Sequence, residues 1–516
     1  ERAAHLVLPV VVVRDAAQGG LDAADDDGHL LEGLVAALRV DQGRPVRPLA
    51  GHTTGRVGVV TADLPVRRVV VDHRIHVPGR HAEEQVRFAQ GLEGLRAVPL
   101  GLRNDPHPKA LRLQHPPNYR HAKVAKDGHR LITNHITPSV EPQFEVSDDQ
   151  TGLFVKPKSN FQGNVRWSIV VQLEDAREDA NFRYFNYLME AHGIEMVHIP
   201  EGKMTLGEPD SSQTRQLFHL YKSDASGKQK GLFTIESENQ VVAIGPKENQ
   251  LYYQAQTPIY QGDQRGELPP AYPKGFAAFY LMKYELSQGQ YADFLNSISS
   301  AATYHRANFG GRDYYQYRGT IRLKDNKYEA MSYHRPCNFI SWDDAMAYAD
   351  WAGLRPYSEL EYEKACRGSL TPLAHEYPWN TASKEALQRY WNPKTDELEG
   401  EEGSNLTEAN RPLTGASYYR VMDLSGGVWE RCITIGDSVG RSFKGTHGDG
   451  VLSQGFATNT DWPKGSTETA GFGFRGGGYY EHDKQYGDLN PNAVIAQRRF
   501  AGWAGGMRSL AYGSRF

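Results

Sequence analysis

The sequence is poor in cysteine, in long apolar runs and in excess positive charge. Its three cysteines, Cys337, Cys366 and Cys432, form no C-x-x-C pair. This excludes a disulfide framework and a structural zinc site, and it predicts buried single thiols. No run of about 18 apolar residues predicts a transmembrane segment. The formal charge is −4 and the pI is near 6.6. The sequence therefore lacks the excess of positive charge that binds nucleic acid, and no nucleic-acid partner is expected.

Aromatic residues are nearly absent from residues 1–115, which contain only Phe88, and this stretch has 14 arginines against one lysine. Without aromatic anchors, runs such as 10–13 and 69–71 predict only weak strands. Two interpretations of residues 1–115 stay open: a compositionally biased, disordered arm, or a wrong-frame translation joined to a genuine reading frame. Because the chain begins with Glu1, we expect a natural N-terminus, with any targeting signal, to be missing from it.

The remaining chain has globular composition, with 39% hydrophobic and 11% aromatic residues over the whole sequence. β-Rich runs separated by turn residues predict a small β-sandwich-like domain over 116–193. An alternating pattern around a Pro200/Gly202 turn then predicts a hairpin over 194–207 that opens a further domain. Four more short apolar runs predict a β insertion at about 208–270.

Three amphipathic helices are predicted after the insertion, each beginning at a serine. Ser287, Ser341 and Ser358 stand at N-cap positions, and the last two have an acidic residue three positions on, as in a capping box. Beyond these helices the chain is rich in glycine, asparagine and tryptophan. Long irregular segments of this kind need ions, ligands or aromatic anchors to fix them.

The stretch D-L-S-G-G-V-W-E places Asp423 and Glu430 on either side of a Gly-Gly turn. Glycine permits backbone conformations that direct carbonyl groups inward. Carboxylate and carbonyl oxygens suit a hard cation such as Ca²⁺ better than Zn²⁺. The local pattern also allows a Gly-Gly bulge with Trp429 in the core and both acids in water.

The predicted strands, helices and motifs, taken in this order along residues 194–516, resemble the formylglycine-generating enzyme family, also called the sulfatase-modifying-factor domain. The resemblance implies a C-type-lectin-like α+β fold with few helices and many loops. The matching blocks are M-V-H-I-P-E-G-K-M-T-L-G (196–207), Y-E-L-S-Q-G-Q-Y-A-D-F-L-N (284–296), the stretch 338–368 from N-F-I-S-W to A-C-R-G, Y-P-W (377–379), D-L-S-G-G-V-W-E (423–430), F-R-G-G-G-Y (474–479) and the closing G-S-R-F.

In that family the tryptophan turn binds a structural calcium ion. Carried over to this sequence, the ligands are the Asp423 and Glu430 side chains and the Gly426 and Val428 carbonyls. Gly427 departs from the family pattern, which usually has asparagine there. The side chain lost at that position is not one of the four ligands, so the resemblance still implies the ion.

The catalytic pattern of the family is missing. Active members hold copper with a pair of closely spaced cysteines after the F-R-G-G motif, whereas residues 479–512 contain no cysteine. Because thiolates are the ligands that hold Cu(I), neither copper nor the oxidase reaction is expected. Glu481, His482 and Asp483 follow the motif and form either a divergent catalytic site or a solvated turn.

Two functions are compatible with this sequence. The first is a sulfatase-modifying-factor-like protein that binds a peptide, glycan or protein partner, or carries altered chemistry; the alternative is an oxidase converting a sulfatase cysteine to formylglycine. Related iron-dependent sulfoxide synthases need a helical domain with His ligands that this sequence does not offer. Free calcium is scarce in the cytosol, where it would not fill a structural calcium site, so we expect a periplasmic or secreted location. The residues predicted either to line a ligand groove or to form surface salt links are Arg498, Arg499, Trp503 and Arg508.

Overall fold

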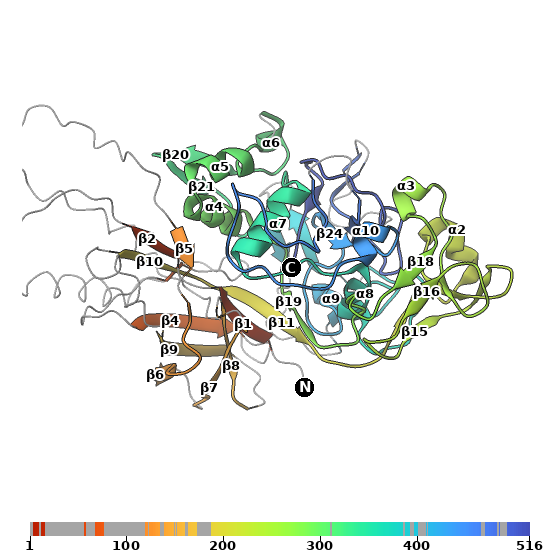
Figure 1. Ribbon diagram of the computed structural model, residues 1–516, viewed down its shortest axis with the longest axis horizontal. Helices are drawn as coiled ribbons and strands as arrows, with labels where there is room; N and C mark the ends of the chain where they lie inside the picture. The colour runs from red at the N-terminus through yellow and green to blue at the C-terminus, as the bar shows by residue number, and fades with distance from the viewer. Residues whose placement is uncertain are drawn as a thin grey trace, which may run out of the picture.

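The computed structural model describes most of the chain from residue 187 onward and separate segments before it. Up to residue 186 the described segments are 4–9, 12–15, 56–57, 68–76, 119–121, 123–134, 139–148, 150, 152–159 and 164–172. From 187 to 516 the gaps are 310–311, 385–386, 393–396, 401–408, 410, 466–469, 482–483 and 486–492. Over these residues the protein is a mixed α/β fold with few helices and small sheets, as expected (Figure 1).

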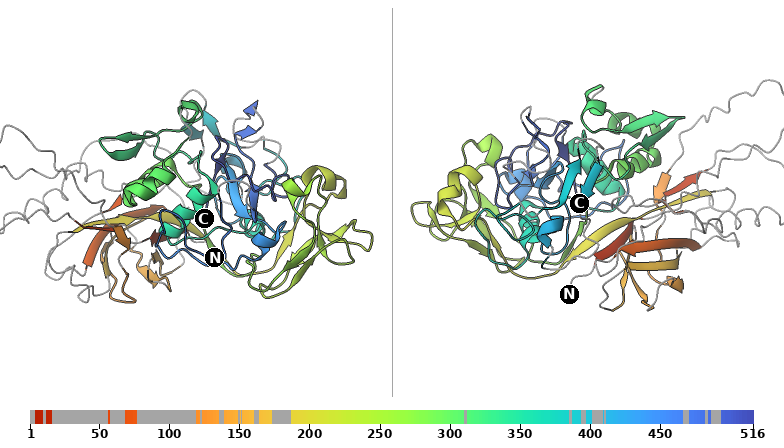
Figure 2. Two further views of the ribbon diagram at one scale, coloured as in Figure 1. Left: turned by 45° about the horizontal axis from the view of Figure 1, so that its top comes forward. Right: turned by 180° about the vertical axis from the view of Figure 1, so that it is seen from behind.

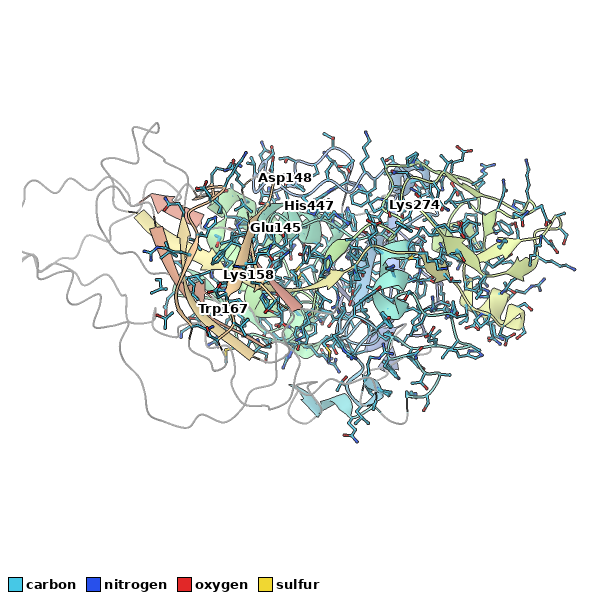
Figure 3. All side chains as sticks on the ribbon, turned by 90° about the horizontal axis from the view of Figure 1, so that it is seen from below. Glu145, Asp148, Lys158, Trp167, Lys274 and His447 are labelled. Carbon is cyan, nitrogen blue, oxygen red and sulfur yellow. The ribbon has the colours of Figure 1, made fainter. Side chains whose placement is uncertain are left out.

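Strands occupy the β-rich region before the main domain. The predicted runs correspond to β5 (Tyr119–His121), β6 (Arg130–Asn134), β8 (Gly152–Pro157) and β9 (Asn164–Gln172). Strand β9 lies between β6 and β4 (Arg68–His76), which contains one of the weakly predicted runs. Trp167 of β9 is buried and donates its indole N–H to the Val140 carbonyl at 2.7 Å (Figure 3). Most of residues 1–115 lie outside the described residues. The choice between a disordered arm and a wrong-frame translation therefore falls outside them too.

A five-stranded sheet crosses the expected domain boundary at residue 193. Its order is β19 (Phe279–Met282), β11 (Ile194–Ile199), β1 (Ala4–Pro9), β8 and β7 (Pro142–Val146). Both edges of β11 are therefore occupied, by β1 and β19. The predicted 194–207 hairpin is wrong for this reason: β12 (Met204–Leu206) pairs with β15 (Phe233–Ile235) instead.

The β insertion forms a sheet of its own at the end of the molecule opposite the early strands (Figures 1 and 2). Lys274 lies where the chain leaves the insertion, and its side chain is fully buried (Figure 3). Its ammonium donates to the carbonyls of Glu238, Pro269, Pro270 and Tyr272 at 2.8, 2.7, 3.2 and 3.0 Å. The strand order is β14 (Gln229–Gly231), β13 (Tyr221–Ser223), β17 (Leu251–Tyr252), β16 (Val242–Ile244) and β18 (Gly266–Leu268).

The three predicted helices are present and begin where expected. They are α4 (Gln288–Ser297), α7 (Trp342–Trp351) and α8 (Glu359–Arg367), and each has a full capping box at Ser287, Ser341 or Ser358. Among the described residues no helix is both long and apolar enough to cross a membrane. Further elements are α2 (Thr214–Leu217), α3 (Pro258–Gln261), α5 (Ser300–Arg306), α6 (Arg312–Gln316), β20 (Ile321–Lys324), β21 (Lys327–Ala330), β22 (Arg389–Asn392), β23 (Glu397–Gly400), α9 (Arg411–Thr414) and α10 (Ser438–Arg441).

The C-terminal part of the chain is organised on a three-stranded sheet. Strand β24 (Trp429–Ile433) lies between β25 (Phe472–Arg475), which is antiparallel to it, and β28 (Tyr512–Gly513), which is parallel. All five residues of β24 are buried. The sheet therefore fixes the end of the Asp423–Glu430 segment from both sides.

Candidate functional site

The segment Asp423–Glu430, here called the tryptophan turn, leads directly into β24. Its backbone is left-handed at Asp423, Gly426 and Gly427, with φ values of 55°, 97° and 61°. Glycine adopts this region freely, whereas an aspartate there is uncommon and has to be held by its surroundings. The turn is therefore a fixed irregular structure.

Glu430 is buried and already has a cationic partner. Its Oε1 accepts from Arg515 Nη2 at 2.7 Å and from Nε at 3.0 Å, while its Oε2 accepts from the same Nε at 3.0 Å and from the Tyr357 hydroxyl at 2.8 Å. A carboxylate offers about four lone-pair positions. Arg515 and Tyr357 therefore engage both oxygens of the Glu430 carboxylate.

Arg515 connects this carboxylate to the rest of the turn and to β19. Its guanidinium also donates to the carbonyls of Met282 at 3.0 Å, Lys283 at 2.8 Å and Asp423 at 3.2 Å. Arg515 of the closing G-S-R-F block thus holds the first and last positions of the tryptophan turn together.

A second buried carboxylate, that of Glu285, lies against the middle of the turn. Its Oε1 accepts from the Val428 N–H at 2.9 Å. A Cβ added at Gly427 would stand 2.5 Å from the same oxygen, so no larger residue fits there without moving Glu285. Burial raises the pKa of Glu285 well above its usual value, and the charges of Glu430 and Asp423 act in the same direction.

The donors around the turn are of the type that calcium binds, namely carboxylate and carbonyl oxygens. Across the described part of the chain, no group of three or more His, Cys, Asp or Glu side chains is arranged to hold a metal ion. An ion at the turn would therefore depend on backbone carbonyls in addition to two carboxylates. The oxygen set fits a hard cation, but Glu430 is engaged by Arg515.

The other predicted site residues are not brought together. Glu481 belongs to the short strand β26 (Tyr480–Glu481), which pairs with β27 (Lys484–Gln485), while His482 and Asp483 lie outside the described residues. Arg498 is fully buried and ion-paired with Glu359 at 2.6 Å, so it does not face a groove.

Arg499 and Trp503 do lie at the surface, on the loop that follows Arg498. Arg499 is exposed and its guanidinium lies 5.2 Å from the centre of the Phe500 ring. Trp503 is half-buried. Arg508, which the sequence grouped with them, instead forms an ion pair with Asp344 at 2.7 Å and donates to the His305 carbonyl at 2.6 Å.

Sequence reasoning missed Tyr260, which comes from the insertion and joins this loop. Its ring lies 6.2 Å from Trp503 and 5.8 Å from Phe500, and its carbonyl accepts from Gly502 N at 2.9 Å. Trp503 in turn contacts the rings of Phe474 at 5.9 Å and Tyr512 at 5.8 Å. We call these five residues, Tyr260, Phe474, Phe500, Trp503 and Tyr512, the Trp503 cluster. No local pattern indicated the whole cluster, because Tyr260 and Phe474 are far in sequence from Phe500, Trp503 and Tyr512.

Arg431 is a second residue that the sequence did not single out, and it lies beneath the Trp503 cluster. Its buried guanidinium is 4.9 Å from the Phe474 ring centre and 5.4 Å from that of Tyr512. It donates to the carbonyls of Gly505, Ile340 and Met507 at 2.9, 3.0 and 2.9 Å. Burial lowers the pKa of Arg431 to about 10. The cluster therefore rests on a buried cation held by carbonyls and rings.

The three thiols are buried in the core, as the sequence predicted. Cys337 packs in the largest apolar cluster, and Cys366 and Cys432 in a second one. Burial raises the pKa of all three.

Comparison of the sequence with known protein families identifies the class of protein that has this fold. The model of the sulfatase-modifying factor enzyme 1-like domain matches residues 189–486, and the chain belongs to that family.

Three curated relatives illustrate how varied the family is. The chain is 28% identical over 201 residues to the formylglycine-generating enzyme of Bos taurus, covering 32% of this chain and 51% of the relative. It is 36% identical over 99 residues to the inactive C-alpha-formylglycine-generating enzyme 2 of Bos taurus, covering 18% and 31%. It is 28% identical over 172 residues to the hercynine oxygenase of Mycobacterium tuberculosis (strain ATCC 25618 / H37Rv), covering 31% and 39%. The chain thus spans about half or less of these relatives.

Proposed function

We propose that this protein is a non-oxidising member of the family that binds a peptide, glycan or protein partner. The observation that carries the proposal is the state of the cysteines. All three are fully buried, they lie in blocks other than the one that follows F-R-G-G, and their raised pKa values keep them protonated. Protonated thiols are poor ligands for Cu(I), because the thiolate is the binding form.

A titration with Cu(I) tests this proposal directly. The full-length protein is titrated against a chromogenic Cu(I) chelator under reducing, oxygen-free conditions. We expect the chelator to retain the copper, since no thiolate pair competes for it. Transfer of one equivalent of Cu(I) to the folded protein, lost in a Cys→Ser variant, would overturn the proposal.

Tyr260 and Trp503 of the Trp503 cluster, with Arg499, form the surface that supports binding. Tyr260 is 37% exposed, its neighbour Ile259 is 64% exposed, Trp503 is half-buried and Arg499 is exposed. Aromatic rings at the surface next to an arginine provide large contact area with little loss of side-chain entropy, and both residue types dominate binding hot spots. Peptide and glycan arrays probed with the wild type and with Trp503→Ala test the assignment. A matched control is Leu323→Ala, which removes a 59% exposed apolar side chain on β20. Signal that survives Trp503→Ala would contradict this surface.

We also propose that the tryptophan turn binds calcium structurally, and that the protein works in a compartment where calcium is plentiful, outside the cytoplasm. Support comes from the left-handed backbone at Asp423, Gly426 and Gly427 and from the oxygen donors around it. When bound, the ion would fix this turn and take no part in a reaction. Chelation is expected to lower the melting temperature by a few degrees, because a ligand present at 100 times its Kd contributes about 2.7 kcal/mol.

A further inference from the structure

Arg431 carries a buried positive charge, and its hydrogen bonds go to carbonyls rather than to a carboxylate. Within the described residues its acceptors are the carbonyls of Gly505, Ile340 and Met507. Its Nε is also buried and has no hydrogen-bond partner in that part of the chain. Buried charges in proteins are usually paired with an opposite charge. Arg431 therefore holds a positive charge that its own hydrogen bonds do not neutralise.

The charged side chains around Arg431 do not remove this excess. The charges of Asp344 and Asp343 act on Arg431. Asp344, however, is ion-paired with Arg306 at 2.9 Å and with Arg508 at 2.7 Å. Three arginines thus share two aspartates, which leaves one positive charge in excess. Burial raises the pKa of Asp344, and protonation of that carboxyl would only increase the excess.

Strand β24 places Arg431 on the side of the sheet where the Trp503 cluster lies. Successive residues of a strand face opposite sides, so Glu430 and its ion pair lie on the other side. The Phe474 and Tyr512 rings of the cluster are 4.9 and 5.4 Å from the Arg431 guanidinium. The buried charge is therefore separated from the surface by the rings of the cluster.

The same guanidinium supports Trp503 through Gly505. The Gly505 carbonyl accepts from Arg431, and a Cβ added to Gly505 would stand 3.1 Å from two atoms of the indole. Because a buried charge is screened less than an exposed one, its field reaches the surface above it. Arg499 carries a second positive charge, which is exposed. The surface of Tyr260, Trp503 and Arg499 therefore suits an acidic ligand.

The packing of Trp503 favours a peptide over a sugar. The indole is half-buried and meets the other four rings of the Trp503 cluster at 5.9, 5.5, 6.2 and 5.8 Å. Sugar rings stack on an open aromatic face, and these neighbours leave little of the indole face open. The edge of an aromatic ring carries the positive end of its quadrupole, which attracts carboxylate and carbonyl oxygens.

We propose that the surface formed by Tyr260, Trp503 and Arg499 binds an acidic peptide segment of a partner protein, and that the excess positive charge at Arg431 selects its carboxylates. This inference rests on the binding function proposed above and names the chemistry of the partner. Arg431 does not touch the peptide. It is a positioning residue, which holds the loop of Trp503 through Gly505 and supplies positive charge from beneath the rings.

Binding of peptides that differ in charge to the full-length protein tests this proposal. The probes are hexaglutamate, hexaglutamine and hexalysine with the same uncharged fluorophore, followed by fluorescence anisotropy. We expect hexaglutamate to bind at least about tenfold more tightly than hexaglutamine. Hexalysine should bind less tightly than either. Raising the salt concentration from about 20 mM to about 300 mM should reduce the preference, because salt screens the interaction.

Variants of Arg431 separate its charge from its structural role. Arg431→Met removes the charge and should reduce the preference for hexaglutamate several-fold, whereas Arg431→Lys keeps the charge and should retain the preference. A merely structural role would weaken hexaglutamate and hexaglutamine by the same factor, as Trp503→Ala should do. The control is Lys324→Gln, which removes a 55% exposed positive charge on β20 and should leave the preference unchanged.

Each outcome bears on one of the two proposals. Equal affinity for hexaglutamate and hexaglutamine, or a higher affinity for hexalysine, would overturn the acidic partner, while the binding function stands if Trp503→Ala weakens both. No binding of hexaglutamate would overturn the acidic partner too, and arrays without any signal would contradict the binding function itself. Array signals confined to acidic glycans would overturn the choice of a peptide. If Arg431→Met does not fold, Arg499→Gln removes the exposed charge, and an unchanged preference in that variant would contradict the proposal.

Discussion

Glu359 is the residue whose replacement should destabilise the protein most clearly through charge alone. It is fully buried at the start of α8 and accepts from Arg498 Nε at 2.6 Å, Arg498 Nη2 at 3.0 Å and Arg475 Nη1 at 3.0 Å. It also accepts from the Ile435 N–H at 2.9 Å. Burial raises the pKa of Glu359, but the two guanidinium groups outweigh burial and hold that pKa below its usual value.

Glu359→Gln keeps the shape of the side chain and removes its charge. Arg475 keeps a second carboxylate, Glu363 at 2.9 Å, whereas Arg498 has no other ion pair within the described part of the chain. Removing one partner of a buried pair leaves an uncompensated charge and costs about 3–5 kcal/mol. We therefore expect a loss of that size in the free energy of unfolding.

Urea denaturation followed by tryptophan fluorescence measures this loss. The control is Glu145→Gln, which breaks the pair with Lys156 at 2.8 Å at the surface, where the Glu145 side chain is 55% exposed. Such exposed pairs contribute about 0–1 kcal/mol. A loss below about 1 kcal/mol for Glu359→Gln, equal to that of the control, would refute the reasoning that this buried network is held by charge.

Three further predictions concern buried groups. Burial lowers the pKa of His219 to about 4, below its unfolded value of about 6.5, so the melting temperature should fall as the pH falls from 6.5 towards 4. His219→Asn should make this fall less steep, and an unchanged slope would contradict the assignment. Cys337, Cys366 and Cys432 should not react with a thiol reagent until the protein is unfolded, and labelling of the native protein would show that a thiol is accessible. Gly473→Ala would place a Cβ 1.9 Å from the Ala501 carbonyl and should cost about 1–3 kcal/mol, whereas Gly231→Ala meets nothing within 4 Å and should not; equal melting temperatures would refute the difference.

The sequence predicted the helices well because their signals are local. A serine cap and a partner three residues later define where a helix begins, and Ser287, Ser341 and Ser358 all form the expected capping boxes. The buried face expected of an amphipathic helix is likewise present in α7, where Ala345 and Tyr348 lie in the core. Such features require only neighbouring residues.

Features that depend on distant partners were not predictable in the same way. Strand β11 pairs with β1 and β19 rather than with β12, because its partners come from parts of the chain far away in sequence. Arg498 lies in the interior because Glu359, 139 residues earlier, lies there to meet it. Glu285 belongs to a block quoted for the family resemblance, but nothing in the sequence indicated that its carboxylate reaches the tryptophan turn.

The most direct test of the central claim, that this family member does not oxidise cysteine, is a turnover assay. A peptide with the C-x-P-x-R motif is incubated with the full-length protein, Cu(I), a reductant and O₂, and is then analysed by mass spectrometry. The account predicts that the peptide mass stays unchanged, because no accessible pair of thiolates holds the copper. A loss of about 18 Da at the cysteine, dependent on the protein and on copper, would show formylglycine formation and contradict the account.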